Sequence, residues 1–217
     1  QLQSSAASDV YKRQISFTEE KSARKLTNKE KIDAIAHHFS SIMKILDLDL
    51  NDDSLKDTPK RVAKMYVEEI FEGLDDSKIP NIKKFENSFD YKGIILEKNI
   101  SLFSLCEHHF VPIIGKAHIG YFANKKIVGL SKLNRIVNFF SKKPQVQEKL
   151  TVQIVDFLKK ELETEDVACI IDAQHLCVSM RGIKDVNSWT TTAEYSGKFL
   201  ESNFKNEFLQ LIVGEKK

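Results

Sequence analysis

The chain has 217 residues, of which 41% are hydrophobic and 29% are charged, with 8 glycines and 4 prolines. This composition predicts one packed domain of ordinary size with mostly regular secondary structure. The net charge of +2 is too small to indicate a nucleic-acid partner, and no apolar run approaches the roughly 18 residues of a membrane span.

The cysteines indicate a reducing compartment. Three is an odd number, and two of them fall in the candidate metal site described below, which argues against a disulfide framework. The third, Cys169, lies in an apolar run and is expected to be a small core residue. No signal peptide is visible, so we expect a cytoplasmic protein.

The first segment, residues 1–25, is polar and aperiodic. It is expected to be a disordered leader or sequence foreign to the domain. Residues 26–217 are expected to form a single domain.

Two helices are predicted next. Thr27 and Glu30 match a capping box, and apolar residues keep helical spacing from there to about Leu46. A second helix is expected to be capped by Thr58, with Pro59 in its first turn. Together they would form a helical N-terminal extension.

From about residue 94 the pattern changes to β-branched, extended segments. We predict strands over 94–103, 113–121, 167–173, 175–181 and 190–199, and helices over 131–140, 145–162 and 201–212. This order predicts an α+β fold in which an antiparallel sheet is backed by a helix pair.

Two Cys-His clusters carry the clearest chemical signal. Cys106 and His109 are three residues apart, so they can bind one metal ion from a single turn, and Cys177 can complete the set. Two thiolates and one imidazole suit Zn²⁺, and a three-ligand site keeps one position open for water, as catalytic zinc sites do. His108 and His175 are then left over as acid–base groups beside the metal.

Other interpretations of these clusters remain open. They are also compatible with a structural zinc site, a redox pair, or buried cysteines without chemistry. A structural site usually has four ligands in paired spacings, and the second cluster holds only one cysteine. His175 could be a fourth ligand, because residues two apart on a strand point to the same face.

A group of cations predicts a phosphate site. Ser131 is expected to cap a helix that carries Lys132 in its first turn and Arg135 one turn later, where the backbone N–H groups and the helix dipole favour an anion. Arg181 would share the strand face of Cys177 by its even spacing. Further positive charge comes from Arg61 and Lys64. Each cation taken alone is better explained as a solvated surface residue, and only the group of cations favours a polyphosphate.

Glu148, at the start of the long helix, could accept two parallel hydrogen bonds from a planar donor pair such as N1–H and the 2-amino group of guanine. From its position alone, a simple interaction of this first-turn glutamate with the helix dipole is the stronger explanation. Glu107 lies between two site residues and receives no assigned role.

These motifs, in this order, resemble the GTP cyclohydrolase I family. The similar stretches are 58–66, 106–112, 129–132, 135–137, 145–151, 175–177 and 181–183. The similarity runs from about residue 26 to residue 212. The departures are Trp189, where smaller residues are common, and the leader.

The resemblance implies zinc on Cys106, His109 and Cys177, and the tunnelling (T-) fold. It implies the proton-transfer pair His108 and His175. It also implies a homo-oligomeric ring, usually a decamer, with active sites at subunit boundaries.

For the substrate, GTP, the resemblance implies guanine recognition by Glu148 with Gln147, and Ser131 near the ribose. Lys132, Arg135 and Arg181 would hold the triphosphate, and Arg61 and Lys64 would reach it from an adjacent subunit. The implied reaction converts GTP and water to 7,8-dihydroneopterin triphosphate and formate, the entry step of folate or pterin synthesis.

The sequence features argue against two rival functions. A T-fold reductase of a 7-cyano-7-deazaguanine precursor uses a cysteine nucleophile and no zinc, which the complete Cys-His-Cys set argues against. A non-catalytic, zinc-stabilised ring subunit would not need His108 and His175, nor the clustered cations.

Overall fold

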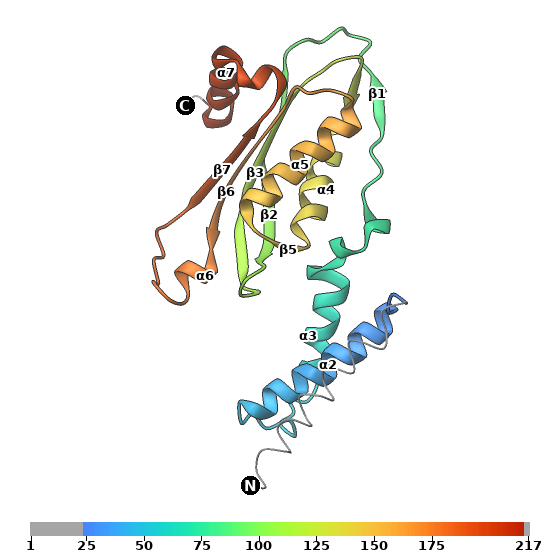
Figure 1. Cartoon of the computed structure of the whole chain (residues 1–217), viewed down its shortest axis with the longest axis vertical. Helices are drawn as coiled ribbons and strands as arrows, with labels where there is room; N and C mark the ends of the chain where they lie inside the picture. The colour runs from blue at the N-terminus through green and yellow to red at the C-terminus, as the bar shows by residue number, and fades with distance from the viewer. Residues whose placement is uncertain (1–23, 215–217) are drawn as a thin grey trace, which may run out of the picture. The chain divides into compact units, whose positions relative to one another are not determined.

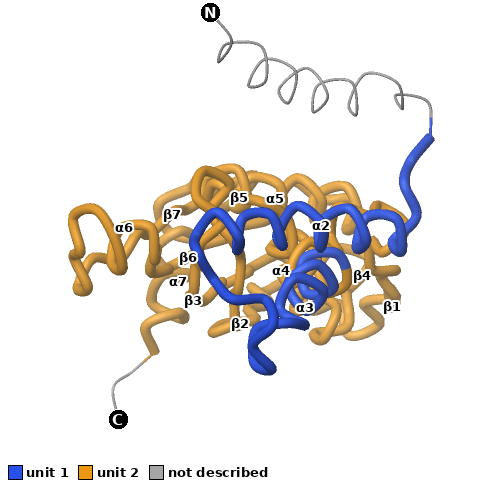
Figure 2. The backbone as a smooth tube through the Cα atoms, turned by 90° about the horizontal axis from the view of Figure 1, so that it is seen from below, with its two compact units in different colours: residues 1–67 blue, residues 68–217 orange. Residues whose placement is uncertain are grey.

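The computed structural model describes residues 24–214, so nearly all of the predicted leader lies outside the described residues. The chain divides into two compact units, residues 1–67 and residues 68–217, which are coloured separately in Figure 2. Within the described residues, no helix is both long and apolar enough to cross a membrane.

The first unit contains helix α2 (Asn28–Ile45), which begins as predicted. Thr27 is its N-cap, and the reciprocal hydrogen bonds of a capping box with Glu30 are both present. These bonds satisfy backbone N–H groups that the first turn of a helix leaves without partners.

The second helix, α3 (Thr58–Lys64), begins one residue earlier than expected. Asp57 is its N-cap and Thr58 its first residue, so the prediction that Thr58 caps the helix is wrong. Pro59 lies in the first turn as expected, where its missing N–H costs no hydrogen bond. The chain continues into a π-helix, η1 (Met65–Ile70).

The second unit is built on a five-stranded sheet with the order β5-β2-β3-β6-β7. The central pairs are antiparallel, and the short β5 runs parallel to β2. A separate pair joins β1 and β4 antiparallel. The strands are β1 (Lys84–Glu86), β2 (Ile94–Cys106), β3 (Pro112–Phe122), β4 (Lys126–Val128), β5 (Pro144–Gln145), β6 (Val167–His175) and β7 (Thr190–Tyr195).

Most predicted elements of this unit are present with shifted ends, but the strand predicted over 175–181 is wrong. β6 ends at His175, and a short helix follows it. The helical elements are η2 (Glu72–Leu74), η3 (Asp76–Lys78), α4 (Leu130–Ser141), α5 (Gln147–Leu162), α6 (Leu176–Ser179), η4 (Gly197–Leu200) and α7 (Ser202–Val213).

The sheet has apolar cores on both of its faces. Along β6, Cys169 and Ile171 belong to the core that α4 and α5 complete, whereas Ala168 and Ile170 belong to the core around Phe199 and Phe208. This alternation follows from the two-residue period of a strand. Figure 1 shows α4 and α5 side by side over one face of the sheet, with α7 on the other. Cys169 is fully buried, as predicted.

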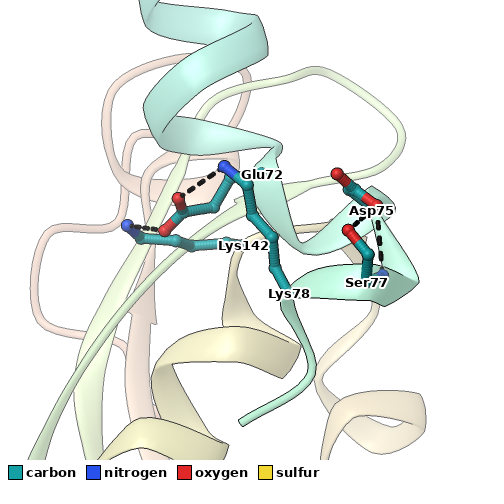
Figure 3. A network of polar contacts seen from close by, with 5 residues as sticks. All are labelled: Glu72, Asp75, Ser77, Lys78 and Lys142. Atoms are coloured by element: carbon teal, nitrogen blue, oxygen red, sulfur yellow. Dashed lines mark hydrogen bonds and ion pairs between the residues drawn. The ribbon is translucent and has the colours of Figure 1, made fainter.

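The segment before β1, residues 72–78, is bound to the end of α4 by hydrogen bonds. The Glu72 carboxylate accepts hydrogen bonds from Lys142 and Lys78 (Figure 3). The Gly73 N–H also donates to the Lys142 carbonyl. The hydrogen bond from Lys142 is the main cause that lowers the pKa of Glu72. A Cβ on Gly73 would lie 2.3 Å from the Phe139 carbonyl oxygen, so only glycine fits here.

Candidate metal centre

Three side chains converge at one end of the sheet. Cys106, His109 and Cys177 each offer a ligand atom, and these atoms lie within 4.8 Å of one another. Cys106 is buried, Cys177 is half-buried and His109 is exposed. The three residues that the sequence singles out therefore lie together, and their role as metal ligands stays a prediction.

The first two candidate ligands are positioned by a tight turn between β2 and β3. Cys106 is the last residue of β2, and its N–H donates to the Val111 carbonyl. The Phe110 N–H donates back to the Cys106 carbonyl, and Phe110 has a φ of 52°. The reversal of the chain therefore brings His109 back toward Cys106.

The third candidate ligand comes from α6 rather than from a strand. β6 ends at His175, which pairs with Ile113, and the chain then turns into the helix that carries Cys177. The prediction that His175 and Cys177 share a strand face is therefore wrong. Helical geometry swings Cys177 toward Cys106 and leaves His175 with the sheet.

The donor chemistry of the triad suits a metal ion. Burial raises the pKa of the Cys177 thiol, and the neighbouring Cys106 raises it further, while Arg181 opposes this shift. The Cys177 thiol therefore resists ionisation in the absence of a metal, and a divalent cation is the partner that stabilises a pair of neighbouring thiolates. Two sulfurs and one imidazole nitrogen are the donors of Zn²⁺ sites that keep an open position. The residues therefore fit zinc.

Two further predicted residues lie at the triad. Arg181 Nη1 is 3.1 Å from His109 Nε2, and because a guanidinium only donates, the imidazole nitrogen accepts. Arg181 reaches this place from the bend after α6, not from the predicted strand. His108 Nδ1 is 3.6 Å from Cys106 Sγ.

His175 is bound to the start of α5. Its Nε2 lies 2.7 Å from Gln147 Oε1, and Gln147 is only 1% exposed. Burial lowers the pKa of His175, and the nearby Glu148 carboxylate partly opposes that effect. Among the described residues His175 is not part of the metal-ligand group, which disfavours the alternative in which it is a fourth ligand.

The first turn of α5 presents two different kinds of side chain. The Gln147 amide is buried in hydrogen bonds, whereas Glu148 is exposed and makes no hydrogen bond or ion pair within residues 24–214. Glu107 is paired with Lys149, which lowers the pKa of Glu107. This ion pair ties the ligand-bearing turn to α5, a role for Glu107 that the sequence did not indicate.

Lys132, another predicted phosphate ligand of the second unit, does not lie at the triad within one chain. Gly129, not Ser131, is the N-cap of α4, so the cap prediction is wrong; Ser131 is the second helical residue. The opposite end of α4 lies near Cys106, because Ser104 Oγ donates to the Ser141 carbonyl. A helix of this length spans about 16–18 Å, which separates Lys132 from the triad.

Arg135 is exposed one turn further along α4. Arg61 and Lys64 belong to the first unit, where the Arg61 guanidinium donates to the Ser54 carbonyl and to Thr58 Oγ1. The roles of these three cations at a triphosphate stay predictions.

Two threonines that support the site were missed. Thr151 and Thr192 lie within hydrogen-bond distance of the Gln147 backbone and side chain, respectively. They are separated from each other by about forty positions in sequence, and no local pattern connects them. Only the packing of α5 against β7 brings them together.

Comparisons with known proteins agree with the geometry. Residues 35–213 match the family profile described as GTP cyclohydrolase I. A protein of Flavobacterium johnsoniae named GTP cyclohydrolase 1 is 53% identical over 187 residues, which cover 86% of this chain and 84% of the relative.

Relatives of the same name occur in other bacteria. That of Actinobacillus pleuropneumoniae is 49% identical over 179 residues, covering 82% of each chain. That of Haemophilus ducreyi is 47% identical over 199 residues, covering 91% of this chain and 88% of the relative. Among solved structures, the apo archaeosine synthase QueF-Like matches 48% of this chain and 94% of its own, with 11% identity and a TM-score of 0.41.

Proposed function

Because the chain belongs to the GTP cyclohydrolase I family and is an enzyme of that kind, we propose that it uses zinc to convert GTP to 7,8-dihydroneopterin triphosphate and formate. This reaction would be the first step of tetrahydrofolate or pterin biosynthesis. The single observation that carries the zinc-dependent part is the convergence of Cys106, His109 and Cys177.

Zinc bound by these three side chains would supply Lewis-acid chemistry, lowering the pKa of water so that a nucleophile is available near neutral pH. The chain's own part is to hold the two thiolates and the imidazole in place. The backbone hydrogen bonds of the turn do this for Cys106 and His109, and α6 does it for Cys177.

His108 and His175 would move the protons. One of them protonates N7 of guanine, which makes C8 electrophilic, and water adds there. The imidazole ring then opens, a second hydrolysis releases C8 as formate, and the ribose rearranges before the new ring closes. Histidine suits both directions of transfer, since its pKa lies near the working pH.

Glu148 would recognise the guanine. Its carboxylate is exposed at the first turn of α5, beside His175, so it has acceptor capacity for N1–H and the 2-amino group. Gln147 is the second guanine contact that the family resemblance implies, and Ser131 would lie near the ribose.

The triphosphate would be held by Arg181 together with Lys132, Arg135, Arg61 and Lys64. Arg181 is already beside His109. Lys132 and Arg135 lie toward the far end of α4 from the triad, which supports a site completed by neighbouring copies of the chain. We therefore also propose the T-fold ring, decameric by family resemblance, and a cytoplasmic location.

The test is zinc analysis combined with a formate-release assay on GTP, using the purified protein. We expect about one zinc per chain and formate released together with a dihydropterin product. Zinc without formate release would support the non-catalytic ring subunit instead. Turnover that persists after zinc has been fully removed would overturn the zinc-dependent mechanism.

A further inference from the structure

We infer that Gln147 is a positioning residue that holds His175 with its Nε2 nitrogen protonated, so that Nδ1 is the ring nitrogen that exchanges protons. The consequence for catalysis rests on the proposed function. The protonation pattern of the resting ring does not, because it follows from hydrogen bonds within the chain.

The orientation of the Gln147 amide is determined by its neighbours. Its Nε2 lies 2.8 Å from the Thr190 carbonyl and 3.1 Å from the Ile171 carbonyl. Backbone carbonyls only accept, so the amide NH₂ must face them, and its two hydrogens are then both used. A flipped amide would place its oxygen against two carbonyl oxygens in a buried site, which is strongly unfavourable.

With the NH₂ group so placed, Gln147 Oε1 must face His175. Its distance to His175 Nε2 is 2.7 Å, a normal hydrogen bond. An amide oxygen can only accept, so His175 Nε2 must carry the proton. In the neutral imidazole the bare nitrogen is then Nδ1, which makes no hydrogen bond within residues 24–214.

Thr151 and Thr192 form further hydrogen bonds around Gln147. Thr151 Oγ1 donates its hydrogen to the Gln147 carbonyl at 2.8 Å. The Oγ1 atoms of Thr151 and Thr192 are 2.7 Å apart, and because the Thr151 hydrogen is already used, Thr192 must be the donor of this second hydrogen bond. Thr192 Oγ1 lies 3.2 Å from Gln147 Nε2, where its remaining lone pair can only share an amide hydrogen that already points to a carbonyl. The network joins α5, β6 and β7, and Gln147 is 1% exposed.

The consequence is a histidine whose orientation does not depend on a metal. Its Nε2 is engaged by a buried amide that is itself anchored to two strands. Partners that orient metal-ligating histidines commonly contribute about 10–100-fold to activity, and we expect an effect of the same order for a partner that orients a proton-transfer histidine.

The experiment compares Gln147→Met with Gln145→Met, and both with the parent protein. Gln145 is an equally buried glutamine two residues earlier, and its side chain contacts Phe140 and Gln153 instead of His175. The two substitutions thus remove the same buried amide from the same region, and a general loss of stability should affect both.

The direct readout is solid-state NMR of the sedimented zinc-loaded protein with ¹⁵N-labelled histidine, at a pH where the imidazoles are neutral. The chain has 6 histidines, and the His175 signals are those lost in His175→Asn. We expect protonated Nε2 and bare Nδ1 in the parent and in Gln145→Met, and a mixture of tautomers in Gln147→Met.

Steady-state kinetics with GTP give the second readout. Gln147→Met should lower kcat by roughly 10–100-fold relative to Gln145→Met, with little change in KM. A bare Nε2 in the parent, or identical tautomers in the parent and in Gln147→Met, would overturn the inference. So would a raised KM at unchanged kcat, which would make Gln147 a substrate contact only. If the parent releases no formate but shows the expected tautomers, the proposed function fails and the positioning role stands.

Discussion

The two segments that bring ligands to the metal centre are held in different ways. The ligand turn, residues 105–111, supplies Cys106 and His109, and the ligand loop, residues 175–189, supplies Cys177. The ligand turn is enclosed by backbone hydrogen bonds and by strand pairing on both sides of β2. It is also tied to α5 by the Glu107–Lys149 ion pair.

The ligand loop leaves the sheet after His175 and is held mainly by side chains. The Gln147–His175 and Arg181–His109 contacts anchor its first half. Its second half exposes large apolar side chains, with Ile183 80% and Trp189 57% exposed. Half of the metal centre is therefore built by the sheet itself, and the other half depends on contacts made at the site.

The largest expected effect is the loss of zinc when any ligand is replaced, whichever segment carries it. Cys106→Ser, His109→Ala and Cys177→Ser should each lose zinc and activity together, because two remaining ligands retain little affinity. Metal analysis of the purified variants measures this. Cys169→Ala, which removes the buried thiol outside the centre, is the control and should keep its zinc. Full zinc occupancy in any ligand variant would refute the assignment.

His108 and His175, one from each segment, are not candidate ligands, so their replacement should affect turnover and leave the zinc in place. His108→Ala and His175→Ala should keep zinc but lose turnover by about 10²–10⁴-fold, the usual contribution of a general acid or base. His38→Ala, an exposed histidine on α2, provides the control. Zinc content and formate release are measured on each protein. Loss of zinc from the His175 variant would make it a fourth ligand and would exclude the hydrolytic mechanism.

Glu148 lies between Gln147, which contacts the ligand loop, and Lys149, which contacts the ligand turn. Replacing Glu148 should therefore disturb neither segment. Glu148→Gln should keep zinc but weaken GTP binding by on the order of 2–4 kcal/mol, since an amide cannot accept both donor hydrogen bonds. Asp156→Asn, an exposed carboxylate further along the same helix, is the matched control. If the Glu148 variant binds GTP with the affinity of the parent protein, the Glu148 carboxylate interacts only with the helix dipole and does not recognise guanine.

The smallest expected effect is a difference in hydrogen exchange, and it tests the contrast between the ligand turn and the ligand loop most directly. Removing zinc with a chelator should speed hydrogen exchange at the amides of residues 176–189 more than at residues 106–111. The turn keeps its backbone hydrogen bonds without metal, whereas the loop loses the link through Cys177. Mass spectrometry of peptides covering each segment measures the difference. Equal acceleration in both segments would show that the metal organises them as one unit.

Much of the fold could be predicted because its signals are local. The capping box at Thr27 and the apolar alternation of β2, β3 and β6 require only neighbouring residues to be recognised. The helix cap at Thr58 and the strand after His175 were predicted wrongly. In each case the true boundary is decided by where the chain reverses, which local propensity does not encode.

The sequence by itself predicted the candidate ligand triad, since thiol and imidazole spacing is a chemical signature that survives an error in secondary structure. Cys177 was assigned from a strand and is found on a helix, yet it is still at the centre. The partners of His175 were decided only by tertiary structure. Gln147 is 28 positions from His175 in sequence, and Thr192 lies on another strand. Their hydrogen bonds exist because α5 packs against β6 and β7, and such long-range contacts leave no periodic trace in the chain.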